Sequence, residues 1–303
     1  MSFIFNTPQK TYDIGNAKIG GQPGENPTFL IASIFWLGQK MVSDANKGVF
    51  DKKIAEDLIN TIQTQSDITG VKFALDIVGT TETAFEQYID FVPSHTDAPL
   101  MLDAMSPRTR IAAANLAKKM GLTDRCIYNS IYKGVTDAEL VNLKESGIAM
   151  SIVLADDPKD TSLEGKMNVL VEALALAEKG GITKPLVDTA VPAFEPDMGT
   201  SVRAIPIMKE KYGHPVGLGS GNLVTTMGWV KSSFEKEFRK GTVCSTNTIM
   251  QMAGANWLMT GPIEQAQWVF PAVAITDAYL ASIGADLGTR PTDENHPIYK
   301  AFM

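Results

Sequence analysis

Cysteine is nearly absent from this sequence, and the absence narrows the class of protein. Only two of the 303 residues are cysteines, Cys126 and Cys244. Two isolated thiols cannot build a disulfide framework, and they lack the clustered histidine and cysteine partners of a structural zinc site. The sequence therefore predicts a protein of a reducing compartment.

Long apolar runs and an excess of positive charge are absent as well. The longest nearly unbroken apolar run, residues 29–37, is about half of the roughly 20 residues that a membrane-spanning helix needs. Lysine and arginine number 27 against 34 acidic residues, so the net charge is −7, which argues against non-specific nucleic-acid binding. Residues 1–15 show no basic head followed by an apolar stretch. We therefore expect a cytoplasmic protein with no membrane span and no nucleic-acid partner.

The sequence does contain a regular alternation of short apolar runs with helical patterns. This alternation is typical of βα units around a parallel sheet, and eight such runs are the number that a (β/α)8 barrel requires. The segments between the runs carry apolar residues at three- and four-residue spacing, as expected for helices packed on a sheet. The predicted strands are residues 28–35, 72–79, 99–106, 125–132, 149–155, 184–191, 215–222 and 255–261.

Nothing in the sequence marks a domain boundary. No linker, charge block, low-complexity tract or short repeat interrupts the alternation. We therefore predict an α/β fold with one domain, residues 1–303, forming a single (β/α)8 TIM barrel. A doubly wound sheet with an added domain is the alternative.

Polar residues interrupt six of the predicted strands near their carboxyl ends, which is the side of a barrel that carries the active site. A single aspartate at such a position often caps a helix, but several on one rim indicate a shared role. Burying a carboxylate is costly without partners, and the three aspartates have no basic neighbour in sequence, so we expect a ligand to supply hydrogen-bond donors. The six residues are Ser33, Asp76, Asp103, Asn129, Asp188 and Asn222.

Two other chemistries are open to these residues. Three carboxylates could bind Mg²⁺, but no P-loop sequence accompanies them, and we expect no metal. The stretch from Gly217 to Gly221 lacks the full spacing of a dinucleotide-binding loop, although it could cradle a phosphate, since glycines let backbone N–H groups approach a ligand.

Five segments carry a specific resemblance to a known family. In order and spacing along nearly the whole chain, KIGGQPGENPTFLIAS, DAPLMLDAMSPRTRIAA, YNSI, KPLVDTAV and TGPIEQAQWVFPAVA resemble the H subunit of tetrahydromethanopterin S-methyltransferase. That family includes soluble bacterial members, similar to the enzyme of glycine betaine demethylation, that move a methyl group from a methylated corrinoid protein to tetrahydrofolate. The resemblance implies a cytoplasmic, corrinoid-dependent methyltransferase that acts as a homodimer.

The resemblance also implies a site. The polar rim is similar to that of pterin-binding barrels, including dihydropteroate synthase and the methyltetrahydrofolate:corrinoid methyltransferases. By this likeness Asp103, Asn129 and Asp188 hold the pterin, and Asp76 is a further contributor. Asn222 matches the asparagine that ends the seventh strand of the corrinoid methyltransferases. We expect it to be the catalytic side chain at the pterin nitrogen N5, with Gly219 and Ser220 shaping the adjacent backbone.

The implied reactants are tetrahydrofolate, as the methyl acceptor, and methylcobalamin. The sequence has no D-x-H-x-x-G stretch of the kind that ligates cobalt in corrinoid carriers, so we expect a separate corrinoid protein as partner. One alternative is a tetrahydromethanopterin-dependent component of a membrane-associated complex. The other is a pterin-binding subunit without catalysis.

Overall fold

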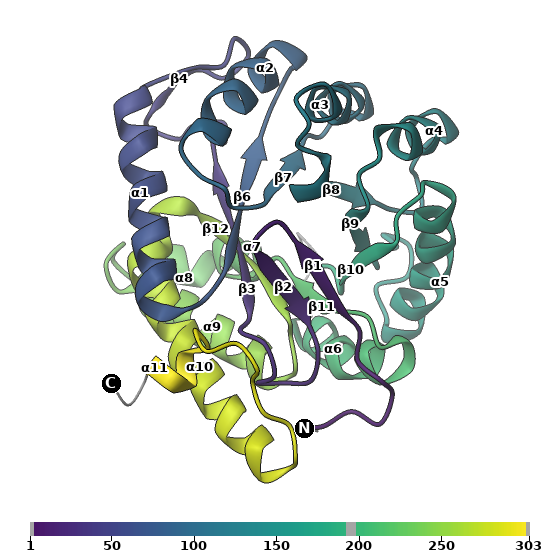
Figure 1. Ribbon diagram of the computed structural model, residues 1–303, viewed down its shortest axis with the longest axis vertical. Coiled ribbons are helices and arrows are strands. Elements are labelled where there is room, and N and C mark those ends of the chain that lie inside the picture. The colour runs from purple at the N-terminus through teal and green to yellow at the C-terminus, as the bar shows by residue number, and fades with distance from the viewer. Residues whose placement is uncertain (1–2, 192–197, 301–303) are drawn as a thin grey trace.

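A closed barrel of eight parallel strands forms the centre of the protein (Figure 1). The computed structural model describes residues 3–191 and 198–300. Each of the eight predicted apolar runs contains or overlaps one barrel strand, which confirms the predicted α/β barrel. In order around the barrel the strands are β10 (Lys184–Asp188), β11 (Val216–Leu218), β12 (Trp257–Pro262), β3 (Phe29–Ile34), β6 (Phe73–Val78), β7 (Leu100–Asp103), β8 (Cys126–Ile131) and β9 (Met150–Leu154).

Helices surround the barrel, and several begin at side chains that cap them. Asp51 accepts from the backbone N–H groups of Lys53 and Ile54, and Thr136 accepts from that of Glu139 at 3.2 Å. The larger helices are α1 (Lys52–Thr69), α2 (Glu82–Phe91), α3 (Pro107–Lys119), α4 (Asp137–Ser146), α5 (Leu163–Lys179), α6 (Met198–Tyr212), α9 (Arg239–Met252) and α10 (Ala266–Asp286). The shorter ones are η1 (Val92–Ser94), η2 (Thr123–Arg125), α7 (Ser220–Thr226), α8 (Gly228–Ser233), η3 (Ile263–Gln265) and α11 (Pro297–Lys300).

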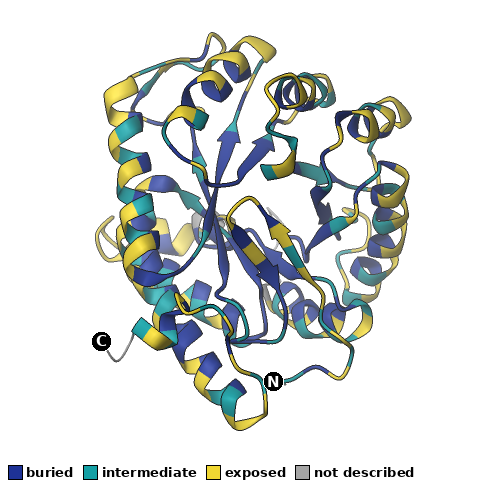
Figure 2. Ribbon diagram, in the orientation of Figure 1, coloured by how far each residue is buried: buried dark blue, intermediate teal, exposed yellow. Residues whose placement is uncertain are grey.

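Two layers of apolar side chains hold the strands in place. One layer lies between the strands and the helices, and the other fills the inside of the barrel. Successive residues of a strand point to opposite faces, so each barrel strand except β11, whose middle residue is Gly217, supplies both layers. Figure 2 shows the strands buried along most of their length. The inner layer includes Phe29, Ile31, Ala74, Met101, Ile127, Met150, Ile152, Leu186 and Trp257.

A short hairpin closes the amino-terminal end of the barrel. Its strands are β1 (Thr11–Ile14) and β2 (Ala17–Gly20), which pair antiparallel and lie across the barrel in Figure 1. Ile14, Ala17 and Ile19 are buried within the inner layer. A second hairpin, β4 (Val42–Asp44) with β5 (Val49–Phe50), precedes α1. The barrel interior is therefore apolar and covered at the end opposite the predicted site.

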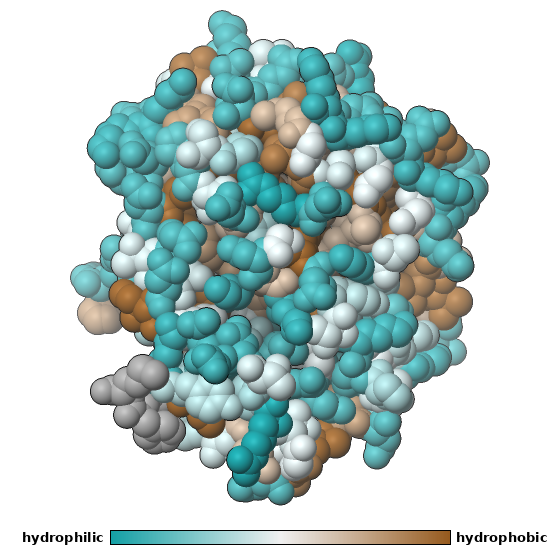
Figure 3. Space-filling view, in the orientation of Figure 1, coloured by the Kyte–Doolittle hydropathy of each residue, from teal (hydrophilic) through white to brown (hydrophobic). Residues whose placement is uncertain are grey.

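Helix α10 packs on α1 and α9 and so closes the ring of helices. Together with η3 it forms the one segment among the described residues, Ile263–Asp286, that is long and apolar enough to cross a membrane. Half of the 18-residue window that passes this test is buried inside the protein, and the core helix of a soluble protein passes the same test. On the face in Figure 3, hydrophilic side chains predominate and apolar ones form separate patches. The absence of a membrane span therefore stays a prediction.

Candidate functional site

The alternation of side chains along the strands brings five predicted rim residues to the inside of the barrel at its carboxyl end. On each of five strands an apolar residue of the inner layer is followed two positions later by a polar one, which therefore points the same way. These pairs are Ile31 and Ser33, Ala74 and Asp76, Met101 and Asp103, Ile127 and Asn129, and Leu186 and Asp188. The structure thus has a polar layer above an apolar interior.

Asp76 lies on β6 in this layer and is only 4% exposed. The hydroxyl of Ser33, its register partner on β3, donates a 2.6 Å hydrogen bond to Oδ2. The other oxygen, Oδ1, is buried and has no hydrogen-bond partner among the described residues. A buried acceptor without a partner costs free energy, so this oxygen is suited to a donor that arrives with a ligand.

Asp103, the last residue of β7, and Asn129, two residues before the end of β8, are register partners, and their side chains are hydrogen-bonded. Burial raises the pKa of Asp103 to about 6, against the opposing effects of the Arg110 charge and the Asn129 hydrogen bond. The pKa of Asp76 is raised well above its usual range, first by burial and then by the neighbouring Asp103 carboxylate. Burial and their mutual repulsion therefore both oppose the state in which these two carboxyls are ionised together.

Asp188 ends β10, two strands away from Asn129, and is 4% exposed. Its Oδ1 accepts a 2.8 Å hydrogen bond from the backbone N–H of Ala190. Burial raises the pKa of Asp188 to about 7, although that hydrogen bond and the charge of Lys166 both lower it. The buried Lys166 Nζ donates to the carbonyls of Thr189 and Ala190 at 2.8 and 3.2 Å and so fixes the turn. Asp188 can therefore change its charge when a ligand binds.

Asn222 does not end a strand, contrary to the prediction. Strand β11 stops at Leu218, and residues from Ser220 onward form α7, so Asn222 lies in the first turn of that helix. Its backbone N–H donates to the carbonyl of Gly219 at 3.1 Å, and the buried Ser220 hydroxyl donates to the carbonyl of Met259 at 3.2 Å. Asn222 is thus at the same end of the barrel as the carboxylates, on the side of β10 and β11.

The glycines around α7 are required by close packing. A Cβ at Gly217 would lie 2.0 Å from the carbonyl oxygen of Trp257, and one at Gly221 would lie 2.7 Å from the backbone nitrogen of Gly261. Both positions therefore face the backbone of β12. This packing accounts for these two glycines without the phosphate cradle that their sequence pattern left open.

Replacing Gly221 with alanine is expected to lower the free energy of unfolding by about 1–3 kcal/mol, because the new methyl group overlaps the backbone of β12. Gly241, within α9, is the matched control, since a Cβ there has nothing within 4 Å. Gly241→Ala should raise stability by about 0.5–1 kcal/mol through helix propensity. Urea unfolding of both variants checks this, and equal effects at the two positions would contradict it.

The polar side chains of the site suit an organic ligand. No group of three histidine, cysteine, aspartate or glutamate side chains in the described ranges is arranged to hold a metal ion, and the exclusion of a metal stays a prediction. The site instead combines carboxylates, which only accept hydrogen bonds when ionised, with an amide that donates and accepts. A flat heterocycle with several N–H donors beside a carbonyl, such as a pterin, is complementary to this set.

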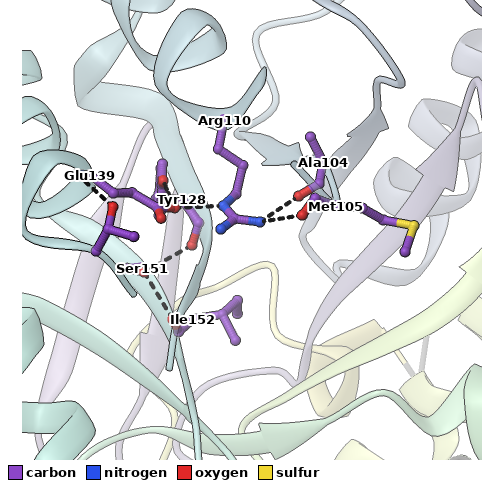
Figure 4. A network of polar contacts seen from close by, with 8 residues as sticks. Ala104, Met105, Arg110, Tyr128, Glu139, Ser151 and Ile152 are labelled. Carbon is purple, nitrogen blue, oxygen red and sulfur yellow. Dashed lines mark hydrogen bonds and ion pairs between the residues drawn. The ribbon is translucent and has the colours of Figure 1, made fainter. Parts of the chain in front are cut away.

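The sequence analysis missed one group of residues next to the site. Arg110, Glu139 and Tyr128 form a buried cluster behind β7 and β8 (Figure 4). A signal was present, because Arg110 lies three, four and seven residues before Ala113, Ala114 and Ala117 on the buried face of α3. A charged residue on the apolar face of a helix indicates a buried partner.

The whole chain is similar to proteins of one family. A family described as the MtrH subunit of tetrahydromethanopterin S-methyltransferase matches residues 7–292. The same subunit of that enzyme from Methanococcus maripaludis is 41% identical, and its counterpart from Methanothermobacter thermautotrophicus is 40% identical. Both alignments cover 98% of this chain and 99% of the relative.

Among solved structures the barrel is similar to dihydropteroate synthases. The enzyme of Yersinia pestis superposes with a TM-score of 0.62 at 13% identity, covering 90% of this chain and 100% of that one. The enzyme of Xanthomonas albilineans gives a TM-score of 0.60 at 18% identity, covering 90% and 99%. At these identities the likeness shows the fold alone.

The relatives correct one prediction. Tetrahydrofolate as the methyl acceptor is wrong by this comparison, because the relatives that match 98% of the chain are named for tetrahydromethanopterin. Neither of these relatives is named for glycine betaine demethylation, so that finer likeness stays a prediction. A homodimer and a cytoplasmic location stay predictions too.

Proposed function

The chain belongs to the MtrH family of tetrahydromethanopterin S-methyltransferase subunits, and from that membership we propose its reaction. A methyl group passes between N5 of a reduced pterin of the tetrahydromethanopterin type and the cobalt of a corrinoid held by another protein. The relatives are named as one subunit of an enzyme, which supports a partner protein that carries the second reactant.

The observation that carries this proposal is the set of buried carboxyls at the barrel mouth. Asp76, Asp103 and Asp188 are enclosed enough that burial raises each pKa, and one Asp76 oxygen is buried without a partner within the described residues. Ring N–H and amino donors of a pterin would stabilise the ionised carboxylates, and Asn129 would meet either a donor or an acceptor of the ring. Gly219 and Ser220 would shape the backbone beside Asn222.

Methyl transfer of this kind is a displacement in which the protein mainly positions the reactants and keeps water out. When the methyl group leaves the pterin, the C–N bond breaks and N5 keeps the electron pair, so a hydrogen bond to N5 assists departure. In the reverse direction the unprotonated N5 attacks the methyl carbon. We assign this role to Asn222, whose amide can donate or accept without titrating.

The test is an anaerobic calorimetric titration with tetrahydromethanopterin, and with tetrahydrofolate as the comparison ligand. Saturable binding is expected to release protons, because the raised pKa values of Asp103 and Asp188 fall when N–H donors bind. Affinity should therefore decrease as the pH is lowered through about 7 to 6. Repeating the titration in buffers of different ionisation enthalpy measures the released protons.

The outcomes separate the alternatives. Absence of saturable pterin binding would contradict the proposal, and tighter binding of tetrahydrofolate would contradict the choice of pterin. Binding without methyl exchange to free cob(I)alamin or to a corrinoid protein would favour a pterin-binding subunit without catalysis. Exchange that depends on the pterin supports the transferase.

A further inference from the structure

A buried charged cluster lies directly behind the polar layer, between the barrel and helices α3 and α4 (Figure 4). Arg110 is 5% exposed and Glu139 is fully buried. The guanidinium Nε of Arg110 donates to Glu139 Oε1 at 2.7 Å, and the hydroxyl of Tyr128 donates to the same oxygen at 2.5 Å. Three elements, α3, α4 and β8, are therefore joined by one carboxylate oxygen.

The other edge of the guanidinium holds the turn after β7. Arg110 Nη1 donates to the carbonyl of Ala104 at 2.7 Å and to that of Met105 at 3.2 Å. These are the two residues that follow Asp103, and Figure 4 shows their carbonyl oxygens converging on the guanidinium. The backbone just beyond the Asp103 carboxylate is thus fixed by a side chain outside the barrel.

The cluster also holds the neighbouring strand. Tyr128 directly precedes Asn129, and its side chain points to the helices while that of Asn129 points into the barrel. The carbonyl of Tyr128 accepts a hydrogen bond from the Ser151 hydroxyl at 2.9 Å. Asp103 and Asn129, the register pair of the site, are therefore each adjacent to an anchored residue.

A contribution to folding stability does not by itself explain why this charged cluster is buried. Replacing a buried ion pair by apolar side chains of similar volume is often neutral or stabilising, because desolvation offsets the attraction between the charges. Glu139 Oε2 and Arg110 Nη2 are also buried without hydrogen-bond partners among the described residues, so the cluster is incompletely satisfied. The cluster does, in contrast, contact the backbone next to two residues of the site, Asp103 and Asn129.

We propose that Arg110 is a positioning residue of the pterin site, which fixes the backbone after Asp103 and, through Glu139 and Tyr128, the backbone that carries Asn129. This inference rests on the proposed function, because it assigns the two held side chains to pterin binding.

Electrostatics adds a second, measurable consequence. The charged groups that affect Asp103 are Asp76 on β6 and Arg110 on α3, and Asn129 on β8 is hydrogen-bonded to it. Arg110 lowers the pKa of Asp103, whereas burial raises it. Glu139 partly neutralises Arg110 from α4. Removing the Arg110 charge should therefore raise the pKa of Asp103, and ligand binding that needs the ionised carboxylate should be lost at a higher pH.

The experiment compares tetrahydromethanopterin affinity across about pH 5 to 8 in four variants, one of which is the single substitution Tyr128→Phe. The triple variant Arg110→Met, Glu139→Leu, Tyr128→Phe removes the cluster without leaving an unpaired buried charge. Arg110→Lys keeps the charge but cannot reproduce the planar fork. Arg108→Ala is the control, because that arginine lies two residues away with its side chain 86% exposed and pairs only with Glu82 among the described residues.

The triple variant should unfold cooperatively, bind about tenfold more weakly, and lose binding at a higher pH than the wild type. Arg110→Lys should weaken binding but leave unchanged the pH at which binding is lost on acidification (the acid limb of the affinity profile). Arg108→Ala should change neither the affinity nor this pH. Hydrogen exchange at the Gly79 amide, which donates to the carbonyl of Asp103 just before the held turn, should quicken in the triple variant. Tyr128→Phe alone should bind about threefold more weakly.

Wild-type affinity and an unchanged acid limb in the triple variant would overturn the inference and leave the proposed function standing. If the triple variant does not fold, wild-type affinity in Tyr128→Phe and Arg110→Lys overturns it instead. A wild-type protein that binds no pterin would overturn both.

Discussion

Replacing Asp188 with asparagine is expected to weaken pterin binding by about 10- to 100-fold. Asparagine keeps the volume and can still accept from the Ala190 N–H, so the turn after β10 should persist. The substitution removes the charge that would pair with ring N–H donors, and a hydrogen bond to a charged group contributes about 1.5–3 kcal/mol. Calorimetric titration with tetrahydromethanopterin at about pH 8, where the Asp188 carboxylate of the free protein is ionised, measures the change.

The control for this prediction is Asp286→Asn, which removes one negative charge at the exposed end of α10. It should leave the affinity unchanged. Equal losses of affinity in the two variants would show that the effect comes from net charge alone. Wild-type affinity in Asp188→Asn would show that Asp188 does not bind the pterin.

The same substitution should have the opposite effect on stability. The pKa of Asp188 is about 7 in the folded protein against an ordinary value of 3.8, because burial disfavours its ionised form. Between these values the unfolded state has lost the proton that the folded state keeps, so the free energy of unfolding falls as the pH rises from about 4 to 7. Above about pH 7 the free-energy cost of burying the ionised Asp188 carboxylate is constant, on the order of 2–4 kcal/mol. Asp188→Asn should remove it.

Urea unfolding of wild type and Asp188→Asn at several pH values tests this prediction. The variant should be more stable at about pH 8, and the difference should vanish below about pH 4, where the carboxyl is protonated in both states. A variant that is less stable at pH 8 would show that the carboxylate has more compensating partners than its surroundings indicate. Weaker binding combined with higher stability is typical of a residue kept for function.

The barrel was predictable because its strands are buried on both faces and appear as apolar runs between helical patterns. The same regularity placed Asp76, Asp103, Asn129 and Asp188, since a polar residue late in such a run must point either into the barrel or toward the helices. The short, partly exposed strands β1 and β2 gave no comparable signal. The end of β11 was misplaced because its glycines are suited to a strand, a turn or a helix start.

Contacts between distant elements could not be predicted. The partnership of Arg110 with Glu139 joins residues 29 positions apart and depends on how α3 packs beside α4. Burial leaves one Asp76 oxygen without a partner among the described residues and raises the pKa values of the site carboxyls, and the sequence indicates burial only by residue type. The pterin was mistaken because methanopterin and folate share the ring that the barrel would hold and differ in the parts beyond it.

Among the described residues, the hairpin β1–β2 covers the amino-terminal end of the barrel, so the polar layer is reached from the carboxyl end. Its apolar residues are packed into the inner layer, so passage through the amino-terminal end is blocked. In the proposed reaction, a pterin would enter and depart through the same end of the barrel at which the corrinoid-carrying partner would arrive. The partner, once seated, would therefore cover the route by which the pterin came in. If the proposed function holds, the pterin would enter first, the partner would dock second, and release would proceed in reverse.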